Sequence, residues 1–234
     1  MRSEPEAAAI ERNERRIQAD SEPRQSIVVG VVGPIGAGKS TLASGLAESL
    51  GFRLFTERVE DNPFFTRFAA DPPTWVFRSQ LAFMLNAVAD AVEARRSGGA
   101  VIERPVHEMH AIFVRDQLRN RLITEQEELL LRQLVEIGDR AGGRPDLLVA
   151  VAASPEVLYE RITNRARPGE EHYSREYIER LARSYDDWLR AWPSSLIEID
   201  SETRDIRERT TIDDLAAEIE RHWSAQQRVG HLGR

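Results

Sequence analysis

The sequence predicts an α/β fold in which a parallel sheet of about five strands carries helices on both faces. Short apolar runs alternate with longer helix-like segments, and a glycine-rich turn joins the first run to the first helix. With 234 residues and 41% apolar content, the chain can bury one sizeable core. We expect one domain at 26–224, between a disordered tail at 1–25 and a mobile tail at 225–234.

The expected elements alternate along the whole chain. The expected strands are 27–32, 52–56, 100–102, 147–152 and 196–199. The expected helices are 41–50, 74–96, 124–141, 154–165, 174–190 and 211–223. Gly51 ends the first helix, Thr124 with Glu127 forms a capping box, and Ser154-Pro155 supplies an N-cap and a first helical residue. Strands separated by helices favour right-handed crossovers and a parallel sheet.

Composition excludes several classes of protein. The chain has no cysteine, so we expect neither disulfides nor thiolate metal sites, and it has no apolar run long enough for a membrane span. Its first 25 residues lack the apolar block of a secretory signal, so we expect a cytoplasmic location. The net charge of -7 argues against binding a nucleic-acid polymer.

The stretch GPIGAGKST at 33–41 fits the phosphate-binding pattern GxxxxGK[ST], between an expected strand and an expected helix. Lys39 is the only lysine, the other cations among 32 Lys+Arg being arginine, and its compact charge can reach the β- and γ-phosphates. Ser40 offers its hydroxyl to Mg²⁺. The residues expected to bind the nucleotide here are Gly33, Ile35, Gly36, Ala37, Gly38, Lys39, Ser40 and Thr41.

A P-loop indicates a nucleoside triphosphate but leaves the acceptor open. GTPases read guanine with an Asn-Lys-x-Asp element, which a chain with its only lysine in the P-loop cannot contain. An LSGGQ-like signature is also absent, which argues against an ABC-type ATPase. A small-molecule kinase remains.

Further motifs, in order, resemble the deoxynucleoside kinase family over roughly residues 26–210. They are TERVEDNP, DPPTWVFRSQ, ERPVHE, RITNRARPGEE and EIDSETRDIR. The resemblance implies a P-loop kinase with an arginine-bearing lid, which transfers the γ-phosphate of ATP to a nucleoside 5′-hydroxyl with Mg²⁺. It also implies a homodimer.

Acidic residues follow two expected strands, at the edge where open parallel sheets bind ligands. A carboxylate there can take the proton of a hydroxyl, and the resemblance implies that Glu57 is this base. We expect Glu103 to approach Mg²⁺ and Arg104 to neutralise the acceptor oxygen or the transferring phosphate. Pro105 stands where the family has serine.

The lid is expected in the segment that contains Arg161, Arg165 and Arg167. These arginines can close over the phosphates, so we expect Arg165 and Arg167 to be catalytic and Arg161 and Arg165 to bind the nucleotide. Glu170 fits the family's partner for the sugar 3′-hydroxyl.

Gln80 lies in an otherwise apolar stripe of the long helix, and the resemblance implies that its amide grips the base. We expect Phe77, Met84 and Met109 to contact the substrate as well. Purine- and deoxycytidine-preferring members have an arginine and an aspartate where this chain has Ala87 and Met109, so the pocket resembles that of pyrimidine-accepting branches. Ala69 replaces a sugar-binding tyrosine, which implies tolerance of a 2′-hydroxyl unless the register differs by one and Phe68 stands there.

Three alternatives stay open. A nucleoside monophosphate kinase of the thymidylate kinase type needs an arginine just before the strand-end acid, where Thr56 stands. A nucleotide-dependent regulatory protein without transfer activity would need no carboxylate base. His107 and His110 flank Glu108 at helical spacing, which suggests a metal site but lacks a third ligand in register.

Overall fold

The computed structural model describes residues 27–167, 170 and 173–232, and it contains the expected parallel sheet of five strands. The strands are β1 (Ile27–Val32), β2 (Arg53–Phe55), β3 (Gly99–Glu103), β4 (Leu147–Ala152) and β5 (Ser195–Asp200). They are ordered β2-β3-β1-β4-β5. All neighbouring pairs run parallel, with Val29 of β1 opposite both Val101 of β3 and Leu147 of β4.

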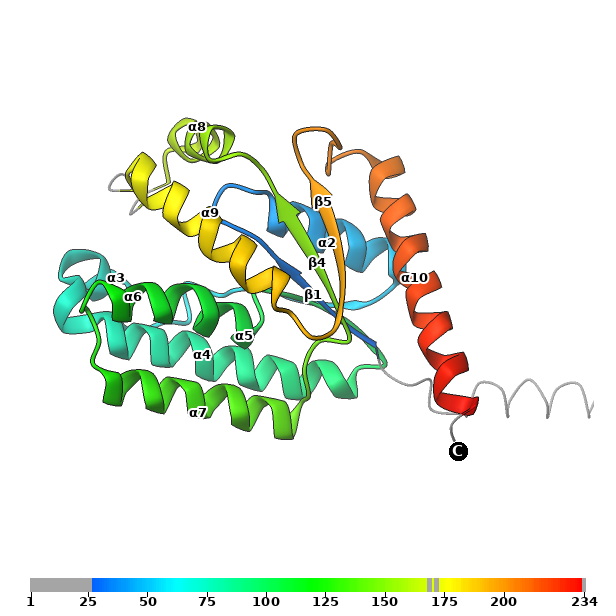
Figure 1. The fold of residues 1–234 in the computed structure, drawn as a ribbon, viewed down its shortest axis with the longest axis horizontal. Coiled ribbons are helices and arrows are strands. Elements are labelled where there is room, and N and C mark those ends of the chain that lie inside the picture. Colours follow the sequence, from blue (N-terminus) through cyan, green and yellow to red (C-terminus); the bar gives the residue numbers. More distant parts are fainter. Residues whose placement is uncertain (1–26, 168–169, 171–172, 233–234) are drawn as a thin grey trace, which may run out of the picture.

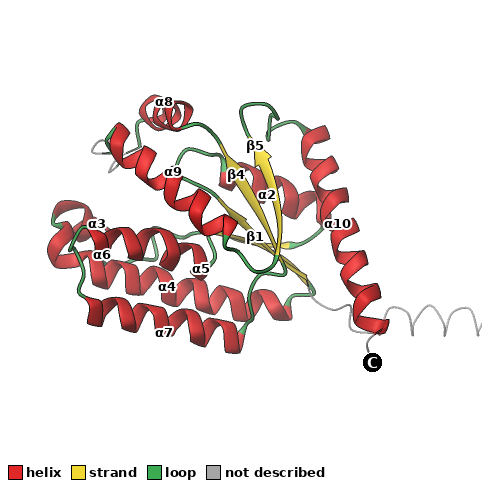
Figure 2. Cartoon of the chain, viewed as in Figure 1, coloured by secondary structure: helices red, strands yellow, loops and turns green. Residues whose placement is uncertain are grey.

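Helices connect the strands and cover the sheet (Figures 1 and 2). They are α2 (Lys39–Leu50), α3 (Phe65–Ala70), α4 (Pro72–Arg96), α5 (Val106–Glu108), the π-helix η1 (Met109–Val114), α6 (Arg115–Arg119), α7 (Glu125–Ala141), α8 (Pro155–Arg165), α9 (Arg175–Arg190) and α10 (Arg209–Leu232). Two of these helices begin or end at the capping residues that the sequence predicts. Gly51 ends α2 in the left-handed conformation, and Thr124 with Glu127 forms the capping box of α7.

The two faces of the sheet bury different residues because side chains alternate along a strand. Val29 and Val31 of β1 belong to a core that also contains residues of α2 and α10. Val28 packs with Ala94 of α4, and Val32 packs with Trp188 of α9. Helices therefore cover both faces, as expected, and the long helices α4 and α7 lie side by side (Figure 1).

Two regions differ from the sequence-based expectation. The helix α3 and the continuous helical run that α5, η1 and α6 form at 106–119 were not predicted. With six residues, α3 is too short to show a sustained helical period, whereas the longer run was missed although its four-residue spacing is present in the sequence. The C-terminal tail expected from residue 225 is helical in the structure, because α10 continues to Leu232. The N-terminal tail expected at residues 1–25 lies outside the described residues. No helix in the described ranges is long and apolar enough to cross a membrane.

The two histidines that suggested a metal site instead join the α5–η1 segment to α7. His107 Nε2 lies 2.6 Å from Asp139 Oδ1, and His110 Nε2 lies 2.8 Å from Glu128 Oε1. Among the residues that the structure describes, no group of three or more His, Cys, Asp or Glu side chains could hold a metal ion. Burial lowers the pKa of both histidines, although their carboxylate partners oppose this effect.

We expect these histidines to make the protein less stable as the pH falls. Their folded-state pKa lies below the ordinary value of 6.5, so the unfolded chain binds more protons in that window and stability drops below about pH 6.5. Each histidine contributes at most roughly 1.4 kcal/mol per pH unit. In urea unfolding between about pH 7 and pH 5.5, His107→Gln should flatten the pH dependence of the unfolding free energy. His222 is exposed, so the control variant His222→Gln should keep the pH dependence of the unchanged protein. Equal slopes of the unfolding free energy against pH for the two variants would contradict this account.

Candidate active site

A cavity of about 590 Å³ opens at the carboxyl edge of the sheet, a volume typical of a small-molecule site. Its walls come from the P-loop, the segments that follow β2 and β3, the helices α3, α4, η1, α6, α8 and α9, and residues between α8 and α9. Its lining residues are Ile35, Gly36, Gly38, Lys39, Ser40, Thr41, Glu57, Val59, Phe65, Phe68, Gln80, Phe83, Glu103, Arg104, Met109, Phe113, Gln117, Arg165, Arg167, Glu170, Tyr173 and Tyr177. The cavity therefore joins residues that are far apart in the sequence.

Glycines shape the P-loop at the bottom of this cavity. Gly33 has φ 144, and a Cβ there would lie 2.3 Å from the carbonyl oxygen of Val151. Gly38 is the left-handed N-cap of α2, where backbone N–H groups and the helix dipole favour an anion. Ala37 is fully buried and donates its N–H to the Pro34 carbonyl, and the Gly33 N–H donates to Glu108 Oε1. Neither residue lines the cavity, although both were expected to bind the nucleotide.

Lys39 occupies a tight position inside the loop. Only 5% of the residue is exposed, and Nζ donates a hydrogen bond of 3.0 Å to the Pro34 carbonyl. Burial and the charge of Arg104 lower the pKa of Lys39 to about 8, while Glu108, Glu103 and Glu57 oppose this shift. A compact ammonium can turn from Pro34 toward a phosphate, whereas a planar guanidinium would need more room.

The two residues expected to hold Mg²⁺ meet beside the P-loop. Ser40 Oγ donates a hydrogen bond of 2.6 Å to Glu103 Oε1, although 63 positions separate them in the sequence. A hydroxyl and a carboxylate are hard oxygen donors of the type that Mg²⁺ prefers, with its other ligands coming from water and phosphate. The residues present therefore fit this ion.

Glu57 and Arg104 form a partly buried ion pair at the ends of β2 and β3. Arg104 Nε lies 3.0 Å from Glu57 Oε2, and only 8% of Arg104 is exposed. Burial lowers the pKa of Arg104, but the carboxylates of Glu57 and Glu108 outweigh it and raise the pKa overall. Arg104 has φ 58, a strained conformation for a non-glycine residue that is common at functional sites. Its guanidinium also stacks on Phe113, with Cζ 4.6 Å from the ring centroid.

The lid brings together Arg165, Arg167 and Glu170, but not Arg161. Arg165 donates two hydrogen bonds to Glu170, at 2.8 and 2.5 Å. Arg161 was expected to bind the nucleotide, yet it does not line the cavity. It donates to Ser201 Oγ at 2.8 Å and to the Ser201 carbonyl at 3.0 Å, which ties α8 to the turn after β5.

Only some of the residues expected to face the base line the cavity. Gln80, which is 7% exposed, lines the cavity with Met109. Phe77 and Met84 were expected to contact the substrate, but they pack into the cluster between α4 and α7, as does Ala87. The stripe on α4 is wider than the cavity, so its flanks fill the core instead.

The expectation that Ala69 faces the sugar also needs a correction. Ala69 is exposed and does not line the cavity, whereas Phe65 and Phe68 both do. Residues three apart share one face of a helix, so α3 presents these two rings together. The expected tolerance of a 2′-hydroxyl rested on Ala69 and loses its basis.

Sequence reasoning missed several residues that line the cavity. Phe113 and Gln117 follow the predicted Met109 at intervals of four along η1 and α6, and Tyr173 and Tyr177 stack with ring centroids 5.1 Å apart. The four-residue spacing was readable in the sequence, but nothing in the sequence showed that this helix face points into a cavity. Burial raises the pKa of both tyrosines, so their hydroxyls keep their protons.

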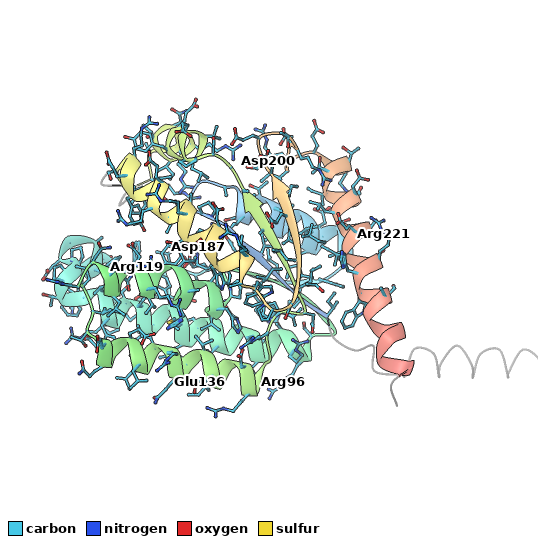
Figure 3. All side chains as sticks on the ribbon, viewed as in Figure 1. Arg96, Arg119, Glu136, Asp187, Asp200 and Arg221 are labelled. Atoms are coloured by element: carbon cyan, nitrogen blue, oxygen red, sulfur yellow. The ribbon has the colours of Figure 1, made fainter. Side chains whose placement is uncertain are left out.

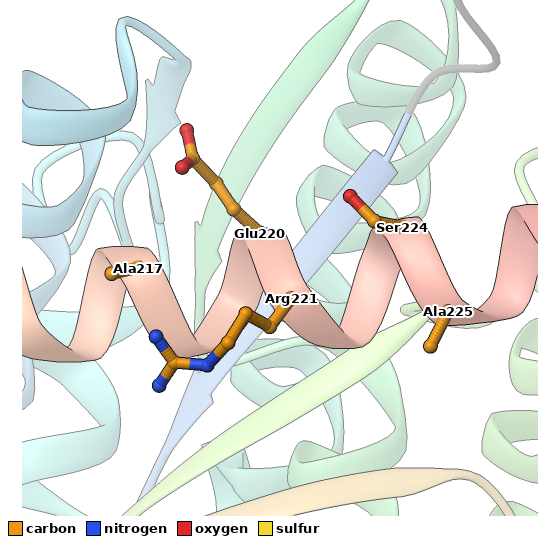
Figure 4. Close-up of a pocket in the computed structure, with 5 residues that line it drawn as sticks. All are labelled: Ala217, Glu220, Arg221, Ser224 and Ala225. Atoms are coloured by element: carbon orange, nitrogen blue, oxygen red, sulfur yellow. The ribbon is translucent and has the colours of Figure 1, made fainter.

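A second hollow, of about 610 Å³, lies along α10 and is lined by Ala217, Glu220, Arg221, Ser224 and Ala225 (Figure 4). All five residues belong to one helix, so among the described residues no polar groups from different elements converge there. Charged side chains also spread over the rest of the surface, for example Arg96, Glu136 and Asp187 (Figure 3). The cavity at the sheet edge is therefore the candidate active site.

Comparison with known proteins agrees with this geometry. The family model described as deoxynucleoside kinase matches residues 29–224. A deoxyguanosine kinase of Lactobacillus acidophilus is 32% identical over 176 residues, covering 72% of this chain and 77% of the relative. Mitochondrial thymidine kinase 2 of Homo sapiens is 24% identical over 178 residues, covering 73% and 67%.

The fold also matches solved structures. A structure of deoxyadenosine kinase from M. mycoides with bound dATP aligns with a TM-score of 0.70 at 21% identity, covering 83% of this chain and 100% of that chain. At this identity the match supports the fold alone.

Proposed function

The chain belongs to the deoxynucleoside kinase family, and from this premise we propose that it transfers the γ-phosphate of ATP to the 5′-hydroxyl of a deoxynucleoside. One observation carries the proposal. The P-loop and the Glu57–Arg104 pair line the same cavity, so a phosphate donor and a hydroxyl acceptor can meet there. This arrangement supplies the positioning and the charge stabilisation on which phosphoryl transfer depends.

The donor side uses the P-loop and the lid. Backbone N–H groups at the start of α2 and the Lys39 ammonium hold the phosphates of ATP. Ser40 and Glu103 would hold Mg²⁺, which when bound neutralises charge on the β- and γ-phosphates. Arg165 and Arg167 approach the transferring phosphate from the lid, once Arg165 exchanges Glu170 for phosphate oxygen.

The acceptor side uses the residues at the ends of β2 and β3. Glu57 accepts the proton of the 5′-hydroxyl while the 5′-oxygen forms its bond to the γ-phosphorus and the bond to ADP breaks. Arg104 holds the Glu57 carboxylate in place and stabilises negative charge on the transferring group. Glu170 accepts a hydrogen bond from the sugar 3′-hydroxyl when the lid closes.

The base pocket combines one amide with apolar side chains. Gln80 can pair with the edge of a base, and Met109 and Phe113 offer apolar contact on the opposite helix. The relatives include a deoxyguanosine kinase and a thymidine kinase, so family membership alone leaves the base open. From the apolar side chain of Met109 beside Gln80, where purine-preferring members have an aspartate, we propose a pocket that accepts pyrimidines at least as well as purines.

A homodimer is part of the proposal. The most exposed large apolar side chains of the described residues all lie on the adjacent helices α4 and α7: Leu85, Leu129, Leu130 and Ile137. A second copy that packs on this pair of helices would cover them. We also propose a cytoplasmic location, in keeping with a substrate of the nucleoside class.

Glu57→Gln tests the proposed base. The amide keeps the shape but cannot accept the proton, so kcat should fall by roughly 10²–10⁴ while nucleoside binding changes little. Steady-state kinetics with calorimetric nucleoside binding measures both quantities. The exposed neighbour Glu60 does not line the cavity, so Glu60→Gln should behave as the unchanged protein. A Glu57→Gln enzyme whose kcat stays within about threefold would place the base elsewhere.

Met109→Asp tests the base pocket. An acceptor against the carbonyl edge of thymine should cost about 1–3 kcal/mol, so kcat/KM for thymidine should fall relative to that for deoxyadenosine. Met109→Leu keeps an apolar side chain and should preserve the order of preference. We expect thymidine and deoxycytidine to match or exceed the two deoxypurines with the unchanged enzyme. A strong preference for a deoxypurine would contradict the pocket while leaving the kinase assignment in place.

Leu130→Arg tests the dimer. A charge in the centre of a buried apolar interface should convert a dimer of twice 26.6 kDa into monomers in analytical ultracentrifugation. Ser224→Arg, on the exposed surface of α10, serves as the control and should leave the mass unchanged. A monomer for the unchanged protein, or a dimer for Leu130→Arg, would show that α4 and α7 are not the interface.

A further inference from the structure

Glu108 is a fully buried carboxylate that the proposed transfer chemistry does not use. It has no exposed surface and does not line the cavity. It is the last residue of α5, four positions after Arg104, and lies between the P-loop and α9. Burying a carboxylate is costly unless charges and hydrogen bonds compensate it, so its surroundings should reveal its role.

Two donors from distant parts of the chain converge on one oxygen of this carboxylate. The Gly33 N–H donates to Glu108 Oε1 at 3.2 Å, and the Tyr185 hydroxyl donates a short hydrogen bond to the same oxygen. Gly33 is the first residue of the P-loop, and Tyr185 lies in the middle of α9. Burial raises the pKa of Tyr185 well above its ordinary value, so this hydroxyl keeps its proton and remains a donor.

Glu108 Oε1 also faces Arg104, the cation that lies beside the proposed position of the acceptor hydroxyl. Arg104 Nη1 lies 4.0 Å from Glu108 Oε1, while Arg104 Nε pairs with Glu57. Burial raises the pKa of Glu108, and Arg104, Lys39 and the two hydrogen bonds oppose that shift. Within the described part of the chain, the second oxygen, Oε2, is buried and has no hydrogen-bond partner. The two hydrogen bonds and the approach of Arg104 therefore all converge on Oε1.

We infer that Glu108 is a positioning residue for phosphoryl transfer, whose carboxylate holds the first residue of the P-loop and the guanidinium of Arg104 in one fixed relation. The donor phosphates rest on the P-loop and the acceptor hydroxyl lies beside the Glu57–Arg104 pair, so this relation sets how the two reactants face each other. Tyr185 anchors the carboxylate to α9, which follows the lid. The inference deepens the proposed function and rests on it.

Charge and hydrogen bonding make separate contributions at this position. A glutamine could still accept hydrogen bonds from Gly33 and Tyr185 through its amide oxygen, but it would leave Arg104 with one carboxylate fewer. Its amide group would also bring donors toward a guanidinium that only donates. A phenylalanine at position 185 would instead keep the charge and remove one anchor.

The experiment compares Glu108→Gln and Tyr185→Phe with Glu220→Gln, an exposed carboxylate on α10 (Figure 4). For Glu108→Gln we expect kcat to fall roughly 10- to 100-fold, since small misplacements of reacting groups have effects of this size. KM for ATP should rise severalfold, while KM for the nucleoside stays within about twofold because Glu108 does not line the cavity in which Gln80 would meet the base. Tyr185→Phe should change the same constants in the same direction, but by less. For the variant with both substitutions, the loss in kcat, expressed as a free energy, should be smaller than the sum of the losses in the two single variants. Glu220→Gln should change none of them.

Several outcomes would overturn the inference. A Glu108→Gln protein with a lower Tm but unchanged kinetic constants would make Glu108 a structural residue only. Equal rises of both KM values would indicate general loosening of the site. If Glu108→Gln fails to fold, Tyr185→Phe decides, and unchanged kinetics in that variant would reject the role. Absence of nucleoside phosphorylation by the unchanged enzyme would instead reject the proposed function.

Discussion

The active site depends on a set of charges that are buried together at the carboxyl edge of the sheet. Arg104, Lys39 and Glu108 are each less than a tenth exposed, and Glu57 pairs with Arg104 at 3.0 Å. No member of such a set is stable alone, because an unpaired buried charge costs several kcal/mol. The charges lie close together only because strands β1, β2 and β3 end at the same edge of the sheet. Its geometry is therefore as rigid as the sheet.

This rigidity contrasts with the lid. Arg165 and Glu170 pair with each other, and their side chains are more accessible than the Arg104 guanidinium. An exposed ion pair contributes little free energy and exchanges partners easily. The rigid edge can thus define where the reactants lie, while the lid supplies charges that rearrange when the reactants bind. Phosphoryl transfer benefits from this division, because its catalysis depends on positioning the reactants and on stabilising the charge of the transferring group.

The candidate site could be predicted from the sequence wherever a residue follows a strand or belongs to a motif. Glu57, Glu103 and Arg104 follow strands, Lys39 and Ser40 belong to the P-loop, and all five line the cavity. Residues on helices were predicted less well. Gln80 faces the cavity while Phe77 and Met84 pack in the core, because an apolar stripe does not show where a cavity interrupts it. Arg161 turned to Ser201, a partner 40 positions away that no local pattern indicates.

The sequence by itself determined the parallel α/β fold, the P-loop and the strand-end acid, because local spacing and backbone geometry encode these features. Only the tertiary structure decided that Phe113, Gln117, Tyr173 and Tyr177 line the cavity and that Glu108 joins Gly33 to Tyr185. These contacts link positions up to 77 residues apart. They arise from how helices pack on the sheet, and packing depends on the shapes of all the side chains at once.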